Sequence, residues 1–394
     1  MDHFRRLYPD IHMKDLVVEE MGPGRLVRIL GRQVVNFGSD SFLGLDQDPR
    51  VQQSIIDGVG KWGTHNGSSR MFASVEANVR AEEKIAAWLG LEAALIFPSV
   101  TLVNAGAIPG LVTKTDVIIA DEFAHNSIQE GIKIARSNGS RAFVFRHNDV
   151  AHLEETLVLA RPYQHALITI DGVYSMSGEL PPFQQIDEIA RRHDAILYVD
   201  DAHGTGVLGR HGRGAVLDVL EKTDNLFAIG SLSKAFSCLG GFVGCPREFH
   251  DLLKCRSNSY IFGGPVPPCY LEAVCTVIDI LHSAEYDLLQ SRLSNNVAHL
   301  AAGAQSHGYQ VLGGHTPIVS LLIGDEEATL KAGRFVFDRG YYVQSVTFPA
   351  VPYHAGVLRI QVNANHEPEQ IAGLLDVLGE WSVHLEQSDE HQAA

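Results

Sequence analysis

The feature that most constrains the fold of this chain is an alternation of short apolar runs with helix-period segments. The runs are rich in Ile, Val, Leu and Phe and are bounded by turn residues: Ala94–Phe97, Asp116–Ala120, Ala142–Phe145, Ala166–Ile170, Ala195–Val199 and Leu226–Ile229. Segments with the period of an amphipathic helix lie between them, such as Val79–Leu89 and Ile186–His193. Strands that alternate with helices form parallel sheets covered by helices on both faces. The sequence therefore predicts an α/β fold, with a large three-layer α/β/α domain on a mostly parallel sheet.

The pattern changes on both sides of this region, and a chain of 394 residues is long enough for two hydrophobic cores. The segment from Pro268 to Gln290 lacks glycine and predicts one long helix. After it, strands are expected near 317–323, 341–346 and 357–362. We predict an N-terminal arm (1–45), a large domain (46–285) and a smaller C-terminal α+β domain (286–394).

Composition narrows the class of protein. A net charge of −16 argues against a nucleic-acid binder, which normally shows a basic face. The five cysteines are odd in number and lack the pairing of metal sites, so we expect no metal and a reduced, cytoplasmic setting. The first residues show no apolar signal segment, and no apolar run reaches the ~18–20 residues of a membrane span.

A lysine follows the last predicted strand of the large domain. It stands in the stretch Gly230-Ser-Leu-Ser-Lys-Ala-Phe-Ser-Cys-Leu-Gly-Gly241, between hydroxyl side chains. A surface lysine on a loop is one interpretation of Lys234. The other is a desolvated lysine with a lowered pKa that forms a Schiff base with pyridoxal phosphate (PLP). Residues elsewhere in the chain have to decide between the two.

Acidic and histidine side chains follow other predicted strands. Asp200 and His203 come after the run Ala195–Val199, and His125 comes shortly after Asp116–Ala120. Asp200 either caps the next helix or holds a proton on a pyridine nitrogen, as PLP chemistry needs. His125 is either a helix cap or a ring that stacks on the pyridine, and His203 is placed to reach the ring hydroxyl. Ligands of parallel sheets bind at the carboxyl ends of the strands, where these residues fall.

Two further segments indicate anion sites. Ser99-Val100-Thr101 follows the run Ala94–Phe97 and opens a helix, whose free amides suit a phosphate, although every strand-to-helix turn offers the same groups. Arg359 lies in a predicted strand of the small domain. It is either an edge-strand arginine paired with a surface acid or a fork for a substrate α-carboxylate.

Together these motifs resemble the α-oxoamine synthase family of PLP enzymes. The resemblance runs from about Asn36 to His366. Seven motifs stand in the family's order: Asn36-Phe-Gly-Ser with Phe42-Leu-Gly-Leu45, Gly67-Ser-Ser-Arg70, Asp121 through His125, Asp171 through Gly178, Asp200 through His203, Ser231 through Lys234, and Thr316-Pro-Ile318. The resemblance implies PLP fold type I, the aspartate aminotransferase-like fold, and a homodimer with its site at the subunit interface.

The resemblance also implies a role for each matching residue. Lys234 would carry PLP covalently, and Asp200 would pair with its pyridine nitrogen. His125 would stack on the ring, and His203 would contact its hydroxyl. Arg359 would bind the amino-acid carboxylate. Phosphate and other cofactor contacts would come from Ser99, Val100, Thr101, Ser175, Ser231, Ser233 and Gly264.

Several positions depart from the family pattern. Asn78 stands where the family usually has a histidine, and Val100 replaces the glycine of the phosphate loop. Gly264 stands where a partner-subunit Ser or Thr usually contacts phosphate, Asp40 replaces an asparagine, and Tyr353-His354 is an insertion. A carboxylate beside a substrate carboxylate repels it by about 1 kcal/mol or more. We therefore expect Asp40 and Asn78 to affect substrate binding, in a divergent member of the family that serves secondary metabolism.

The implied reaction joins an α-amino acid to an acyl thioester carried by coenzyme A or by a carrier protein. The amino acid displaces Lys234, loses its Cα proton, attacks the thioester and loses carbon dioxide, which leaves an α-aminoketone and a free thiol. Once released, Lys234 is the natural proton carrier. Two alternatives stay open: an aminotransferase or C–C lyase with the same PLP site, and a catalytically inactive structural or regulatory subunit.

Overall fold

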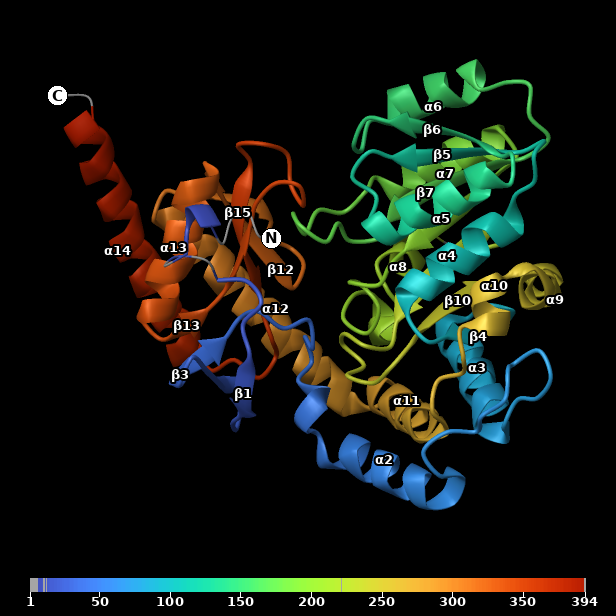
Figure 1. Cartoon of the computed structure of the whole chain (residues 1–394), viewed down its shortest axis with the longest axis horizontal. Coiled ribbons are helices and arrows are strands. Elements are labelled where there is room, and N and C mark those ends of the chain that lie inside the picture. Colours follow the sequence, from blue (N-terminus) through green and yellow to red (C-terminus); the bar gives the residue numbers. More distant parts are fainter. Residues whose placement is uncertain (1–5, 10, 12, 221, 393–394) are drawn as a thin grey trace. The chain divides into compact units, whose positions relative to one another are not determined.

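The computed structural model describes residues 6–9, 11, 13–220 and 222–392 (Figure 1). The chain forms two compact units. The larger unit contains Gly44–Tyr174 and Leu180–Asp287, and the smaller unit contains Met1–Leu43, Ser175–Glu179 and Leu288–Ala394. The division into parts 1–45, 46–285 and 286–394 stays a prediction, because a compact unit is not by itself an independently folding domain.

A seven-stranded sheet forms the centre of the larger unit. Its strands lie in the spatial order β4 (Ala93–Phe97), β10 (Gly241–Cys245), β9 (Leu226–Ser231), β8 (Ala195–Asp200), β7 (Ala166–Asp171), β5 (Val117–Asp121) and β6 (Arg141–Phe145). The last five of these are parallel, and β10 is antiparallel to both of its neighbours. The predicted mostly parallel sheet and all six predicted strands are confirmed.

Helices surround this sheet and close its core (Figure 1). Apolar side chains of β4, β5, β9 and α4 are fully buried together, among them Leu95, Ile118, Phe97 and Val103. The helices of the larger unit are α2 (Pro49–Trp62), α3 (Glu76–Leu89), α4 (Val100–Leu111), α5 (Asn126–Ser137), α6 (Val150–Leu159), α7 (Phe183–Arg192), α8 (Val216–Val219), α9 (Arg247–Arg256), α10 (Asn258–Phe262) and α11 (Pro268–Leu281), with short 3₁₀ turns at Leu45–Gln47 and Arg210–Gly212.

The sequence pattern missed β10. Its run Gly241-Phe-Val-Gly-Cys245 is interrupted by glycines, which are depleted in strands. The structure explains the first of them, because a Cβ atom on Gly241 would lie 2.6 Å from the backbone nitrogen of Val100. Glycine here lets β10 approach the start of α4, a tertiary requirement that no local pattern reports.

The predicted single helix from Pro268 to Gln290 is wrong. The first helix, α11, ends at Leu281, and α12 runs from Ala284 to Ser306. At the break, His282 Nδ1 lies 3.0 Å from the Ile278 carbonyl, and Ser283 Oγ donates to the Ile280 carbonyl at 2.7 Å. These local side-chain bonds compete with the helical ladder and end the first helix.

Two four-stranded sheets build the smaller unit. One has the order β1 (Val18–Met21), β2 (Leu26–Ile29), β3 (Arg32–Asn36) and β13 (Tyr341–Tyr342). The other has the order β11 (Gln310–Gly313), β12 (Ile318–Gly324), β15 (Gly356–Gln361) and β14 (Gln344–Val346). The predicted strand at 341–346 is thus split between two sheets. The remaining helices are α13 (Glu326–Asp338) and α14 (Pro368–Gln392).

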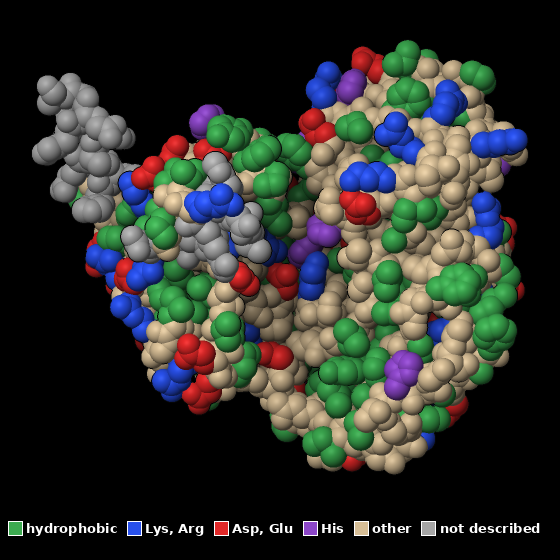
Figure 2. Space-filling view, viewed as in Figure 1, with side chains coloured by type: hydrophobic (Ala, Val, Ile, Leu, Met, Phe, Trp, Pro, Cys, Tyr) green, Lys and Arg blue, Asp and Glu red, His purple; other side chains and the backbone are tan. Residues whose placement is uncertain are grey.

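Among the described residues, none of the helices combines the length and the apolar character that a membrane crossing needs. On the face drawn in Figure 2, basic and acidic side chains are interspersed rather than gathered into one basic surface.

Candidate active site

Polar side chains of the larger unit meet at the carboxyl ends of its parallel strands. Asp171 and Asp200 are direct neighbours in the register of β7 and β8. A cavity of about 200 Å³ opens there. Its lining brings together nine residues predicted from the sequence and two that were not, Asp171 and Ala202. The predicted ones are Ser99, Val100, Thr101, His125, Asp200, His203, Ser231, Ser233 and Lys234.

Lys234 lies in the turn that follows β9 and is half-buried. The turn is held by backbone hydrogen bonds from Ser237 to Lys234 and from Leu232 to Gly240, at 2.8 and 2.9 Å. Lys234 Nζ lies 2.8 Å from His203 Nε2. The lysine therefore faces a histidine on the cavity lining, and the two nitrogens lie within hydrogen-bond distance.

Asp200 is buried and held in place from two sides. Asn104 Nδ2 donates to Asp200 Oδ2 at 2.6 Å, and the Ala202 amide donates to Oδ1 at 3.3 Å. Asn104 Oδ1 in turn accepts from the Tyr198 hydroxyl at 2.7 Å. Complete burial raises the pKa of Tyr198 well above its ordinary value, so this hydroxyl stays a donor. The carboxylate is thus orientated by a relay of two buried side chains.

Sequence reasoning missed Asn104. It is fully buried in α4, and its Nδ2 also donates to Ser127 Oγ at 2.8 Å. The available signal was a single amide in the otherwise apolar helix Val100–Leu111. A buried amide is costly unless its hydrogen bonds are made, so one that persists in such a helix indicates a partner.

His125 is the N-cap of α5. Its Nδ1 accepts from the Ser127 amide at 3.2 Å and lies 2.7 Å from Ser127 Oγ. Its own backbone amide donates to Asp171 at 2.9 Å. The helix-cap alternative is confirmed by this geometry. The same residue lines the cavity, so the two predicted alternatives for His125 are compatible.

Carboxylates crowd this edge of the sheet. Burial, and then the neighbouring Asp200, raise the pKa of Asp171 well above its ordinary value. Burial is also the main cause that raises the pKa of Asp201 to about 7. Desolvation and like charges both favour the neutral acid. Burial and the neighbouring carboxylate therefore favour the neutral form of Asp171 on the cavity lining, next to an aspartate that has hydrogen-bond donors of its own.

The start of α4 and the end of β9 supply anion-binding groups. Ser99 is the N-cap of α4, where its Oγ accepts from the Leu102 amide at 3.2 Å. Ser231 Oγ lies 3.1 Å from Ser233 Oγ and accepts from the Ser233 amide. Helix N-terminal amides and hydroxyls together suit a phosphate group.

Arg359 lies in the smaller unit, on β15, and is 4% exposed. Because β15 lies between β12 and β14, the edge-strand alternative is wrong. The guanidinium donates from Nε to the Ser175 carbonyl at 2.6 Å, from Nη1 to Gln344 Oε1 at 2.9 Å and from Nη2 to Asp40 Oδ1 at 3.1 Å. Three predicted residues, Arg359, Asp40 and Ser175, therefore form one cluster, and Ser175 contributes its backbone.

Two predicted residues lie elsewhere in the larger unit. Asn78 is buried in α3, and neither its amide nitrogen nor its amide oxygen has a hydrogen-bond partner among the described residues. Gly264 follows α10 with a φ of 75°, and nothing lies within 4 Å of a Cβ placed there. Neither of them lines the cavity.

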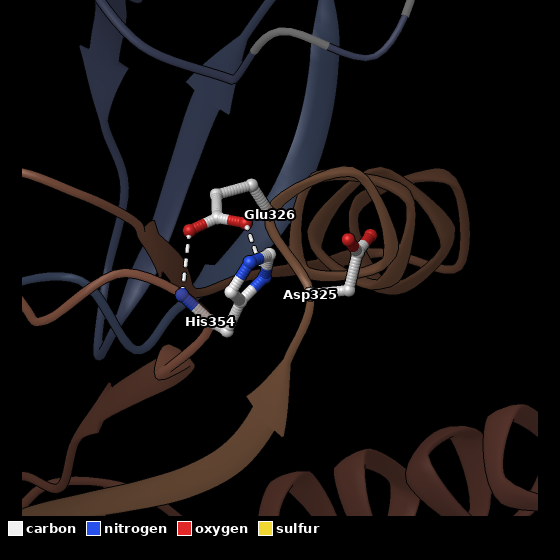
Figure 3. A group of neighbouring side chains, drawn as sticks. All are labelled: Asp325, Glu326 and His354. Carbon is white, nitrogen blue, oxygen red and sulfur yellow. Dashed lines mark hydrogen bonds and ion pairs between the residues drawn. The ribbon is translucent and has the colours of Figure 1, made fainter.

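The inserted residues Tyr353 and His354 lie in the loop before β15 (Figure 3). The His354 amide donates to Glu326 at 2.9 Å, and its Nδ1 lies 3.5 Å from the same carboxylate. Asp325, beside Glu326, caps α13 by accepting from the Ala328 amide. The two acids thus anchor a loop and a helix end, which accounts for a cluster whose residue types also suit a metal ion.

Comparison with known proteins decides the family. Residues 32–378 match the family model for aminotransferase class I and II. The chain is 35% identical over 342 residues to the 8-amino-7-oxononanoate synthase of Geobacter sulfurreducens, covering 86% of this chain and 87% of that one. The same enzyme of Alkaliphilus oremlandii is 35% identical over 356 residues, covering 89% and 88%. The chain belongs to the α-oxoamine synthase family.

A solved structure agrees with this assignment. The serine palmitoyltransferase of S. paucimobilis, which holds PLP, matches with a TM-score of 0.89 at 26% identity and covers 94% of this chain and 93% of that one. This α-oxoamine synthase therefore has PLP fold type I and is a PLP-dependent C-acyltransferase.

Proposed function

We propose that the cavity at the carboxyl ends of β5, β7, β8 and β9 holds PLP and that the chain joins an α-amino acid to an acyl thioester there. The products are an α-aminoketone, carbon dioxide and a free thiol, with coenzyme A or a carrier protein as the thiol. The observation that carries this proposal is the presence of Lys234, His203 and Asp200 on one cavity lining.

The side chains present fit each part of PLP. The Lys234 amine would bond to the aldehyde. Asp200, already orientated by Asn104, would pair with the pyridine nitrogen. His203 suits the ring hydroxyl, and His125 suits the ring face. The phosphate would bind at the N-terminus of α4, formed by Ser99, Val100 and Thr101. Ser231 and Ser233 would also contact it, as would Gly264 of a partner subunit. When bound, PLP withdraws electrons from the Cα atom of the amino acid.

Proton movement falls to Lys234 and His203. The Lys234 amine would hold PLP and, once free, would take the Cα proton of the amino acid, because it stays within reach of that atom. His203, 2.8 Å from Nζ, orientates the amine and exchanges a proton with it. Asp200 is held toward the cavity by the two donors, Asn104 Nδ2 and the Ala202 amide.

We also propose that the chain acts as a homodimer. Large apolar side chains are exposed on the larger unit at Phe72 and Phe262, which are 87% and 81% exposed. The segments that carry them are tied together by a 2.6 Å hydrogen bond from Ser69 Oγ to the Ile261 carbonyl. Exposed apolar surface of this kind is typical of an interface. Light scattering on wild-type protein and on a Phe262→Asp variant tests this, with a shift toward monomer expected.

The test of the reaction is a panel of amino acids incubated with acyl thioesters. Release of thiol and carbon dioxide in equal amounts is expected for one pair of substrates. Formation of a keto acid without thiol release would instead support the aminotransferase alternative. Absence of any reaction, with PLP bound, would support an inactive subunit. The matched control is Lys234→Ala, which keeps the fold but lacks the reactive amine.

A further inference from the structure

The arginine cluster of the smaller unit is paired within the chain itself. Arg359 is buried, with 5% of its side chain exposed, whereas the Asp40 side chain is 28% exposed. Three of the arginine's nitrogens donate to Ser175, Gln344 and Asp40. The carboxylate of Asp40 is the one anionic group among these partners, and it is also the accessible half of the ion pair.

Further contacts stabilise this arrangement. The Gln361 nitrogen donates to the Phe37 carbonyl at 2.9 Å, and its amide oxygen accepts from Arg359 Nη1. An arginine beside a carboxylate forms a strong charge-assisted hydrogen bond, and a second carboxylate competes with the first for the same donors.

We propose that Asp40 is an internal carboxylate that holds Arg359 until an amino acid binds, and that it thereby weakens and selects amino-acid binding. This inference rests on the proposed function and on the role that the family resemblance implies for Arg359, which is to bind the amino-acid carboxylate. The incoming carboxylate has to exchange with Asp40, so each binding event breaks one ion pair to form another. Asparagine at this position, as in the family pattern, keeps the shape and removes the competing charge.

The selection follows from charge balance. Once Asp40 has been displaced, two carboxylates lie near one guanidinium, and the extra negative charge disfavours any further anion on the substrate. Asp40 therefore acts against amino acids with acidic side chains in particular. Removing its charge should strengthen binding of every amino acid and should favour acidic ones most.

The experiment is a titration of the PLP-loaded protein, monitored by the absorbance of the bound cofactor. L-alanine, L-aspartate and ethylamine are the probes, because ethylamine has the amine but no carboxylate. In Asp40→Asn, we expect the Kd for L-alanine to fall about tenfold and that for L-aspartate to fall further, with ethylamine unchanged. The charge-matched control is Asp376→Asn, which removes an exposed acid on α14.

Each other result contradicts a specific step. Equal affinity of wild type and Asp40→Asn for L-alanine would overturn the inference, as would an equal gain for ethylamine. If Asp40→Asn does not fold, Asp40→Ser in the same titration keeps the inference testable. Failure of the proposed function would look different: the wild-type protein would then bind no PLP, or would bind it and release no thiol with any substrate pair.

Discussion

The cavity of the larger unit and the arginine cluster of the smaller unit are both built from buried charged groups, but they differ in how those charges are paired. In the cavity, Asp200 is held by two neutral donors, Asn104 and the Ala202 amide, rather than by a charged side chain. In the cluster, Arg359 is held by the carboxylate of Asp40, so its charge is balanced before any ligand arrives. The first arrangement is preorganised for a cation. In the second, an incoming carboxylate has to replace Asp40 on the arginine.

The largest effect is expected from the lysine of the cavity. Lys234→Ala should lower thiol release about 10³-fold or more, since it removes both the covalent attachment and the proton carrier. The absorbance band of protein-bound PLP should shift to that of the free cofactor. A variant that keeps both the absorbance band and the activity would contradict the assignment of the cavity as the cofactor site.

A smaller and different effect is expected from the cluster. Arg359→Ala should leave the PLP absorbance unchanged but raise the KM for the amino acid about 10² fold, as expected for the loss of charge-assisted hydrogen bonds. The double variant Asp40→Asn with Arg359→Ala should bind no better than Arg359→Ala alone. Independent effects of the two substitutions would show that Asp40 acts without the arginine.

The relay behind Asp200 should contribute less. Asn104→Ala removes the donor at 2.6 Å and should weaken PLP binding about tenfold, with a change in the pH at which the cofactor spectrum titrates. Tyr198→Phe, which removes only the next hydroxyl in the relay, should have a smaller effect in the same direction. Unchanged spectra in Asn104→Ala would assign this residue to packing alone.

The buried carboxylates of the cavity edge should appear in the pH dependence of stability. The pKa of Asp201 is raised from 3.8 to about 7, mainly by burial, so the folded state holds this proton more tightly than the unfolded state. This contribution is fully present below about pH 4 and is lost as the pH rises toward 7.

Asp201→Asn should therefore flatten the fall in unfolding free energy between those pH values, by an amount on the order of a few kcal/mol. Urea denaturation at pH 5 and pH 7.5 measures this difference in unfolding free energy for the wild type and the variant. An identical slope in wild type and variant would contradict the raised pKa. The control is Asp376→Asn, which removes an exposed acid on α14 and should leave the slope unchanged.

The sequence by itself determined six of the seven strands of the large sheet and most of the residues at their carboxyl ends. Both follow from local patterns: strand and helix periods are read within a few residues, and parallel strands bring their carboxyl ends to one edge. Lys234, His203, Asp200 and His125 were found in this way, and the structure lines one cavity with all four.

Only the tertiary structure decided which partners those residues have. Asn104 meets Asp200 across 96 positions, and Asp40 meets Arg359 across 319. Contacts of this range depend on how elements pack, and local periodicity carries no record of them. The same is true of β10, whose Gly241 is required by the approach of α4 rather than by the strand itself. For this reason the cofactor chemistry was predictable from the sequence, whereas the self-paired arginine was not.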